Sequence, residues 1–217
     1  GVEIIGNSRT ATLLFSILLA SGVTNTRISL SASYKHPTVV ESDLGSGSLR
    51  TTDLGLNFKK RIEELAREWS LFPVASSFAL AQRGAPKPVV PEKNLRIICG
   101  SFDSQYVEHL LRDGQDHFFV GRAPGHVATV GPFVQPGSTP CRRCLSLIEA
   151  DRVGVAELSI PLGTSDELPI AVAHQVAALA AHAALKFIDT GTSELQAAQL
   201  IVDFLDALNP QLQHFPQ

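Results

Sequence analysis

The feature that most constrains the fold of this chain is a glycine turn near its start. Residues 2–5 are apolar enough for a buried strand, and Gly6 follows them directly. Leucine and isoleucine then recur at helical spacing between positions 13 and 18. A strand, a tight turn and a helix form the first half of a β-α-β unit, so we expect strands that pair in parallel.

The turn itself is close to the glycine-rich fingerprint of dinucleotide-binding folds. That fingerprint has three small positions, and here they are Gly6, Ser8 and Ala11. Ser8 narrows the approach of a phosphate, but its hydroxyl and N–H lie at a helix N-terminus, where anions bind readily. We therefore expect Gly6, Asn7, Ser8, Arg9 and Ala11 to bind a nucleotide. The alternative is that the turn serves the fold and binds none.

The second part of the fingerprint, an acid after the second strand that binds a ribose, is absent. Residues 31–33 read Ser-Ala-Ser, and the nearest acids are Glu41 and Asp43. Lys35 is positioned to contact a 2′-phosphate, so an NADP-binding oxidoreductase is one alternative. No proton-transfer constellation accompanies it.

Strands and helices alternate along the rest of the chain. This alternation predicts an α/β fold with a Rossmann-like, mainly parallel sheet, helices on both faces and a C-terminal extension. We find no internal repeats, and we expect residues 31–53 to form a long loop and residues 131–140 a Pro/Gly-rich connection. The expected strands are residues 27–30, 72–78, 95–99, 117–121 and 126–130, the expected helices are residues 58–69, 105–111 and 168–187, and residues 198–205 form a last strand or helix.

Length and composition narrow the class of protein. The 217 residues suit one domain, 1–217, whose C-terminal half, 131–217, holds a cysteine pair and an Ala-rich helix that packs closely on two sides. A net charge of −3 argues against nucleic acid and anionic membranes as partners. The apolar stretch 13–23 is too short to span a bilayer.

Three cysteines indicate a reducing compartment, so we expect a cytoplasmic protein. Because the chain opens on a strand and contains no Met, we also expect that an N-terminal portion is missing.

The most informative stretch is Gly-Pro-Phe-Val-Gln-Pro-Gly-Ser-Thr-Pro-Cys-Arg-Arg-Cys-Leu at residues 131–145. Cys141 and Cys144 are spaced to ligate one metal ion, but a structural zinc needs four ligands. Three interpretations stay open. The pair is half of a zinc site completed elsewhere, a metal-free relic, or a redox pair, although no thioredoxin-like strand-to-helix context precedes it.

Taken together, these motifs resemble the ThiF/MoeB family, the bacterial relatives of ubiquitin-activating enzymes. The resemblance covers residues 2 to about 205. Residues 131–145 are especially similar to an actinobacterial-type branch near the ThiF-like partners of thiazole- and oxazole-forming cyclodehydratases. The motifs that carry it are the turn at Gly6, Asp53-Leu54-Gly55 before Lys59 and Lys60, Asp103 after the strand at 95–99, and Pro140-Cys141-Arg142-Arg143-Cys144-Leu145.

The resemblance implies an adenylyltransferase that uses ATP and magnesium on the carboxylate of a peptide or ubiquitin-like carrier protein. It implies that Asp103 holds magnesium and that Lys59 or Lys60 contacts the phosphates, with Arg9 and Arg50 as further cations. It also implies a homodimer. The plainer alternatives are that Asp103 caps a helix and that both lysines lie on a solvated helix face.

Several departures from the family pattern favour a second hypothesis. The ribose acid is absent, Ser104 stands where the family often has Asn, and Glu108 stands where Arg is common. A second Cys pair is also absent from the sequence. The alternative is therefore a catalytically degenerate ThiF-like scaffold that binds a peptide or a partner protein.

Overall fold

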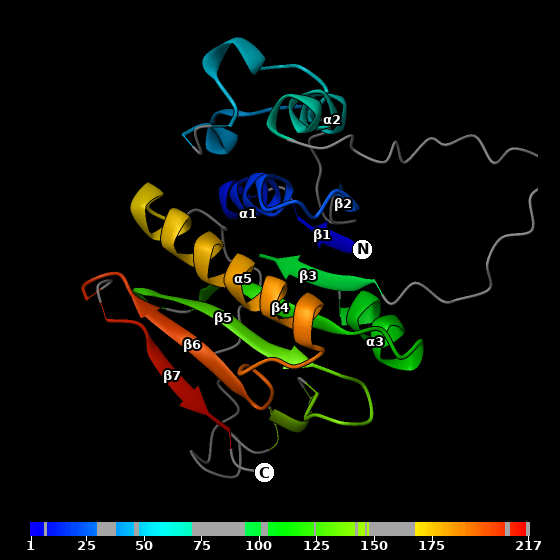
Figure 1. Ribbon diagram of the computed structural model, residues 1–217. Coiled ribbons are helices and arrows are strands. Elements are labelled where there is room, and N and C mark those ends of the chain that lie inside the picture. The colour runs from blue at the N-terminus through cyan, green and yellow to red at the C-terminus, as the bar shows by residue number, and fades with distance from the viewer. Residues whose placement is uncertain are drawn as a thin grey trace, which may run out of the picture.

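Seven strands form a single sheet in the order β2-β1-β3-β4-β5-β6-β7 (Figure 1). In this computed structural model the strands are β1 (Val2–Ile5), β2 (Thr26–Ser29), β3 (Leu95–Cys99), β4 (His117–Ala123), β5 (Val127–Val134), β6 (Ala198–Asp203) and β7 (Gln211–His214), and the helices are α1 (Arg9–Ala20), α2 (Phe58–Trp69), α3 (Ser104–Arg112) and α5 (Ile170–Thr190). The structure describes residues 1–6, 8–29, 38–45, 48–70, 94–100, 104–123, 125–141, 143–145, 147, 168–206 and 209–215.

The sheet is parallel in its first half and antiparallel in its second. β1 pairs in parallel with β2 and β3, and β3 with β4, whereas the pairings from β4 through β7 are antiparallel. The expected mainly parallel sheet is therefore correct for β1 to β4 and is corrected for the rest. The link between β4 and β5 spans only residues 124–126, which is too short for the crossover that a parallel pair needs.

Helices cover both faces of the sheet, as expected. Figure 1 shows α1 and α5 packed on one face, α2 outside α1, and α3 on the other face. The larger apolar cluster joins the sheet to α1, α2 and α5. A smaller cluster joins Val107 and Leu110 of α3 to Ile5, Ile98, Phe119 and Val134.

The Ala-rich helix α5 packs closely on two sides. Its buried alanines lie against α1 and against β4 and β5, because small side chains let helix and sheet backbones approach. By length and composition alone, α5 is the one helix among the described residues that is apolar enough to cross a membrane. A helix buried in the core of a fold passes the same test, so this is weak evidence for a span.

β5 extends through the region expected to be a connection. The β4–β5 register shifts between Phe118 and Val120, because Gly131 and Pro132 together lie opposite Phe119. This is a β-bulge, one of the few places where a strand accepts proline, which has no N–H to donate. The strand continues to Phe133 and Val134, both fully buried.

Some of the remaining secondary-structure predictions are confirmed, and others are not tested. The helix at residues 58–69 and the strand at 95–99 are confirmed with their limits. The last segment forms the strand β6, and β7 was not expected. The strand expected at residues 72–78 lies outside the described residues.

Part of the expected long loop folds into two similar turns. Residues 40–45 and residues 50–55 both contain Asp-Leu-Gly, form a 3₁₀ turn and end in a glycine with positive φ. We call them the first and second D-L-G turns. In each, the aspartate carboxylate accepts the backbone N–H three residues earlier, from Val40 over 2.9 Å and from Arg50 over 2.8 Å. The sequence therefore does contain a short repeat, at a spacing of ten residues.

Candidate functional site

Among the described strands, the topological switch point of the sheet lies between β1 and β3. The helix that follows β1 packs on one face and the helix that follows β3 packs on the other. Parallel strands whose helices diverge in this way leave a crevice outside their carboxyl ends, and ligands of such sheets bind there. The candidate site is therefore the carboxyl edge of β1 and β3.

Gly6 directly follows β1 at this edge of the sheet. Its φ of 138° is in a region that other residues rarely adopt. A Cβ at this position would lie 2.3 Å from the carbonyl oxygen of Cys99, the last residue of β3. The close approach of the two backbones thus requires glycine.

The N-terminus of α1 faces this crevice and is capped by Ser8. The Ser8 hydroxyl accepts the N–H of Ala11 over 3.3 Å. Ala11, at the third small position of the fingerprint, is fully buried. Aligned peptide dipoles give this helix end a partial positive charge, so the turn at Gly6 and the first residues of α1 suit a phosphate group.

Thr10, the second residue of α1, is a candidate site residue that the sequence analysis missed. Its side chain is only 3% exposed, and its hydroxyl has no hydrogen-bond partner among the described residues. Buried polar atoms in native proteins are nearly always hydrogen-bonded, so this hydroxyl calls for a partner such as a bound ligand or water. The only sequence signal was a polar residue where an apolar one would pack equally well.

Arg9 does not extend freely toward the crevice. Its guanidinium donates to the carbonyl oxygens of Leu44 over 2.7 Å, Leu168 over 3.2 Å and Ser42 over 3.2 Å. The side chain that was expected to meet phosphate thus holds protein backbone.

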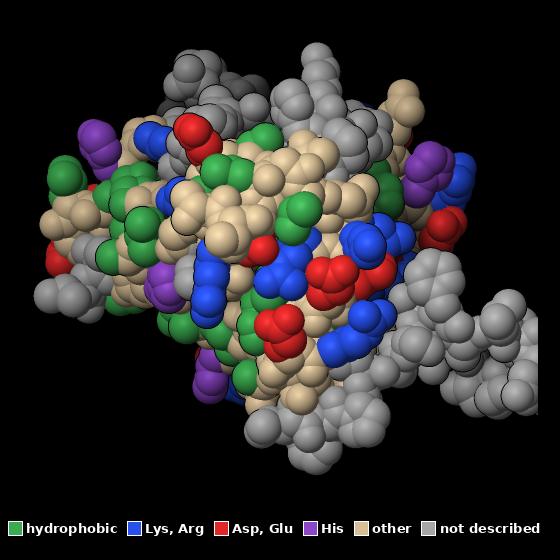
Figure 2. Space-filling view, turned by 90° about the horizontal axis from the view of Figure 1, so that it is seen from above, with side chains coloured by type: hydrophobic (Ala, Val, Ile, Leu, Met, Phe, Trp, Pro, Cys, Tyr) green, Lys and Arg blue, Asp and Glu red, His purple; other side chains and the backbone are tan. Residues whose placement is uncertain are grey.

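The other expected cations lie around the second D-L-G turn and α2. The backbone N–H of Arg50 bonds to Asp53, and the side chains of Arg50, Lys59 and Lys60 are exposed. Asn57 caps α2 by accepting the N–H of Lys60 over 3.0 Å. Figure 2, seen from above the α2 side, shows Lys and Arg side chains interleaved with Asp and Glu. This face therefore carries side chains of both charges and is not a purely basic patch.

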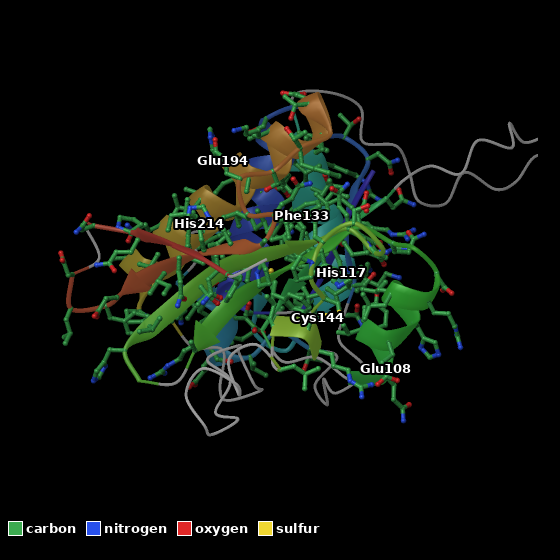
Figure 3. All side chains as sticks on the ribbon, turned by 90° about the horizontal axis from the view of Figure 1, so that it is seen from below. Glu108, His117, Phe133, Cys144, Glu194 and His214 are labelled. Carbon is green, nitrogen blue, oxygen red and sulfur yellow. The ribbon has the colours of Figure 1, made fainter. Side chains whose placement is uncertain are left out.

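Asp103 and Asn7, which were expected to contact magnesium and nucleotide, lie outside the described residues, as do residues 31–33 and Lys35. Gly100, directly after β3, has a φ of 83° and donates its N–H to Val120 over 2.8 Å. Glu108, whose charge departs from the family pattern, is exposed on α3 (Figure 3).

The cysteine pair lies on the α3 side of the sheet. The sulfurs of Cys141 and Cys144 are 3.5 Å apart, and Cys141 packs against the smaller apolar cluster (Figure 3). Cys99 belongs to the larger cluster on the opposite face and cannot join them. Among the described residues no group of three or more His, Cys, Asp or Glu side chains is placed to hold a metal. A structural zinc needs four ligands, of which the described residues would offer at most these two thiols.

His117 is a buried titratable group on the same face. It is 1% exposed, and its Nδ1 lies 2.8 Å from the carbonyl oxygen of Gln115. Burial lowers the pKa of His117 below its ordinary 6.5, although the Gln115 hydrogen bond and the charge of Asp116 act in the opposite direction. Because the Gln115 carbonyl oxygen can only accept, Nδ1 carries the proton of the neutral ring, and Nε2 is unprotonated and has no partner among the described residues.

Comparison with known proteins relates the fold to solved structures. No family profile and no curated protein sequence matches the chain. The microcin C7 biosynthetic enzyme MccB, solved with N-formylated MccA, superposes at a TM-score of 0.67 and 18% identity, over 100% of this chain and 64% of MccB. E. coli MccB solved with AMPCPP and MccA gives 0.68 and 16%, over 100% and 64%. PaaA gives 0.63 and 16%, over 99% and 63%.

These likenesses concern the fold. The chain has the Rossmann-like architecture of MccB and PaaA, and it spans less than two thirds of their length.

Proposed function

We propose that this chain is a ThiF/MoeB-type domain that binds ATP at the β1–β3 crevice and activates the carboxylate of a peptide or small carrier protein by adenylation. In that reaction a carboxylate oxygen attacks the α-phosphorus of ATP, and pyrophosphate leaves. The observation that carries the proposal is the close approach of Gly6 to the Cys99 carbonyl, beside the Ser8-capped N-terminus of α1 and at the topological switch point. E. coli MccB, which shares the fold, has been solved with ATP and with AMPCPP and MccA.

The residues of this chain would act mainly by positioning. Backbone N–H groups at the start of α1 would contact phosphate oxygens, and the α1 dipole would stabilise their charge. Asp103 would hold magnesium, with Lys59 or Lys60 and Arg50 supplying positive charge for the departing pyrophosphate. Magnesium would supply charge neutralisation between the phosphates.

Calorimetry of the full-length protein with ATP and magnesium tests this proposal. We expect saturable binding that is lost in Asp103→Ala and retained in Asp113→Ala, a control at the exposed end of α3. Pyrophosphate release should then depend on the added peptide. If an intact, folded protein binds neither ATP nor AMPCPP, the proposal is wrong.

The second candidate function is a catalytically degenerate scaffold that binds a peptide or a partner protein. The contacts of Arg9 favour it, because they direct one expected phosphate cation to backbone carbonyls. This function predicts peptide binding in the absence of ATP and an affinity that added ATP leaves unchanged.

We also propose that Cys141 and Cys144 are two ligands of a zinc ion whose other ligands come from outside the described residues. Elemental analysis of the full-length protein tests this: zinc near one equivalent should fall sharply in Cys144→Ser. A metal-free wild-type protein would leave the relic and redox interpretations. The homodimer and the cytoplasmic location stay predictions.

A further inference from the structure

Arg9 connects parts of the chain that are far apart in sequence. Its Nε and one terminal nitrogen donate to carbonyls of Leu44 and Ser42, which are 35 and 33 residues away. The other terminal nitrogen donates to Leu168, which is 159 residues away. One side chain at the first position of α1 thus holds both the first D-L-G turn and the segment that leads into α5.

The three segments meet closely. A Cβ added to Gly45 would lie 3.1 Å from Cδ1 of Ile170 and 3.7 Å from Nε of Arg9. Gly45 ends the first D-L-G turn, and Ile170 is the first residue of α5. Because α1 starts at the carboxyl end of β1, this junction lies at the edge of the sheet where the crevice opens.

The second D-L-G turn has an ion pair that does not involve Arg9. Its aspartate, Asp53, bonds through Oδ1 to Nε of Arg61, only eight residues away. In the first turn, Arg9 binds the main-chain carbonyls of Ser42 and Leu44. Removing the Arg9 guanidinium should therefore loosen the first turn and the start of α5 while the second turn keeps its ion pair.

We propose that Arg9 is a positioning residue of the nucleotide site, which fixes residues 40–45 and the start of α5 at the mouth of the crevice and does not itself bind phosphate. This inference rests on the proposed ATP binding. A guanidinium presents donors in several directions in one plane, so it can reach three carbonyls on two segments. A lysine carries the same charge but has a single nitrogen, which cannot span them.

Lysine substitution separates positioning from charge. In calorimetry with AMP, ADP and ATP, we expect Arg9→Lys and Arg9→Gln to weaken all three ligands by a similar factor, about tenfold or more. A phosphate-binding cation predicts the opposite pattern: Arg9→Lys retains affinity, and the loss in Arg9→Gln grows from AMP to ATP. That pattern would overturn the proposal.

Hydrogen exchange gives a readout that needs no ligand. Arg9→Lys should speed amide exchange in residues 40–45 and in the first turn of α5, but not in residues 50–55. Arg112→Lys is the matched control, because the Arg112 side chain is 72% exposed and, among the described residues, pairs with Asp113 alone. Unchanged exchange in Arg9→Lys overturns the inference. A wild-type protein that binds no nucleotide overturns the proposed function and the nucleotide role of Arg9, while exchange still decides whether Arg9 holds the two segments.

Discussion

Asp53 and Arg61 are joined by a 2.8 Å hydrogen bond between Oδ1 and Nε, and the second oxygen of Asp53 accepts the backbone N–H of Arg50 over 2.8 Å. The Asp53 side chain is 5% exposed and that of Arg61 is 20% exposed. One buried carboxylate thus fixes the second D-L-G turn to the first turns of α2. The exposed cations Arg50, Lys59 and Lys60 therefore have backbones that are held relative to one another.

The Asp53→Ala substitution should destabilise the protein by about 2–4 kcal/mol, because it leaves Arg61 and the Arg50 N–H without their shared acceptor. Urea unfolding measures this loss. Glu64→Ala is the control, since Glu64 pairs with the same Arg61 but is 40% exposed, and it should cost under about 1 kcal/mol. Equal losses in the two variants would show that burial of Asp53 adds nothing.

Two glycines with positive φ offer a matched pair of substitutions. Gly6→Ala should cost about 3 kcal/mol or more or prevent folding, because the new Cβ would meet the Cys99 carbonyl. Gly55 has a φ of 79°, and no atom lies within 4 Å of a Cβ added there. Gly55→Ala should therefore lower the free energy of unfolding only by the backbone strain, about 1–2 kcal/mol. In thermal unfolding, the Tm of Gly6→Ala should therefore be well below the Tm of Gly55→Ala. The reverse order would contradict the close approach of β1 and β3.

Thr10→Val removes a buried hydroxyl that has no partner among the described residues. The valine is nearly isosteric, so the free energy of unfolding without ligand should stay within about 1 kcal/mol of the wild type or rise. If the hydroxyl contacts a bound nucleotide, calorimetry should show about a tenfold weaker Kd for ATP, which Thr10→Ser restores. A large loss of stability in the ligand-free protein would instead indicate a hidden structural partner.

His117 should make stability depend on pH. Because burial lowers its pKa in the folded protein, the unfolded chain binds a proton first as the pH falls below about 6.5. The stabilising contribution is therefore complete above this pH and is lost as the pH falls toward the folded pKa. Urea unfolding between about pH 7.5 and pH 5.5 should show a smaller decline for His117→Gln than for the wild type. Parallel declines would contradict the buried, neutral ring.

The parallel half of the fold was predictable because its signals are local. Gly6, the apolar run at residues 95–99 and the amphipathic pattern of α2 each lie within one short window. The antiparallel half was not, since hydrophobic periodicity carries no strand direction. β7 reads Gln-Leu-Gln-His, an edge strand with a single apolar side chain, so it has little apolar pattern to detect.

The candidate site was predictable only in part. The turn at Gly6 was visible, but the acceptors of Arg9 are backbone carbonyls up to 159 residues away, and carbonyls have no sequence signature. The two D-L-G turns, unlike the carbonyls that Arg9 binds, did have a signal in the sequence. The tripeptide Asp-Leu-Gly occurs twice, and the sequence analysis did not identify it as a repeat. Asp53 was noted only as part of a family motif, whereas its pairing with Arg61 became visible only in the structure.

The contact between Gly6 and Cys99 changes what a glycine at this position can reveal about ancestry. The carbonyl of Cys99 leaves no room for a side chain there, so the fold favours glycine whether or not a nucleotide binds. A lineage that stopped binding nucleotides would keep it unchanged. Evolutionary loss of activity would first be recorded at Ser8, Thr10 and their neighbours, where the backbone sets no such demand.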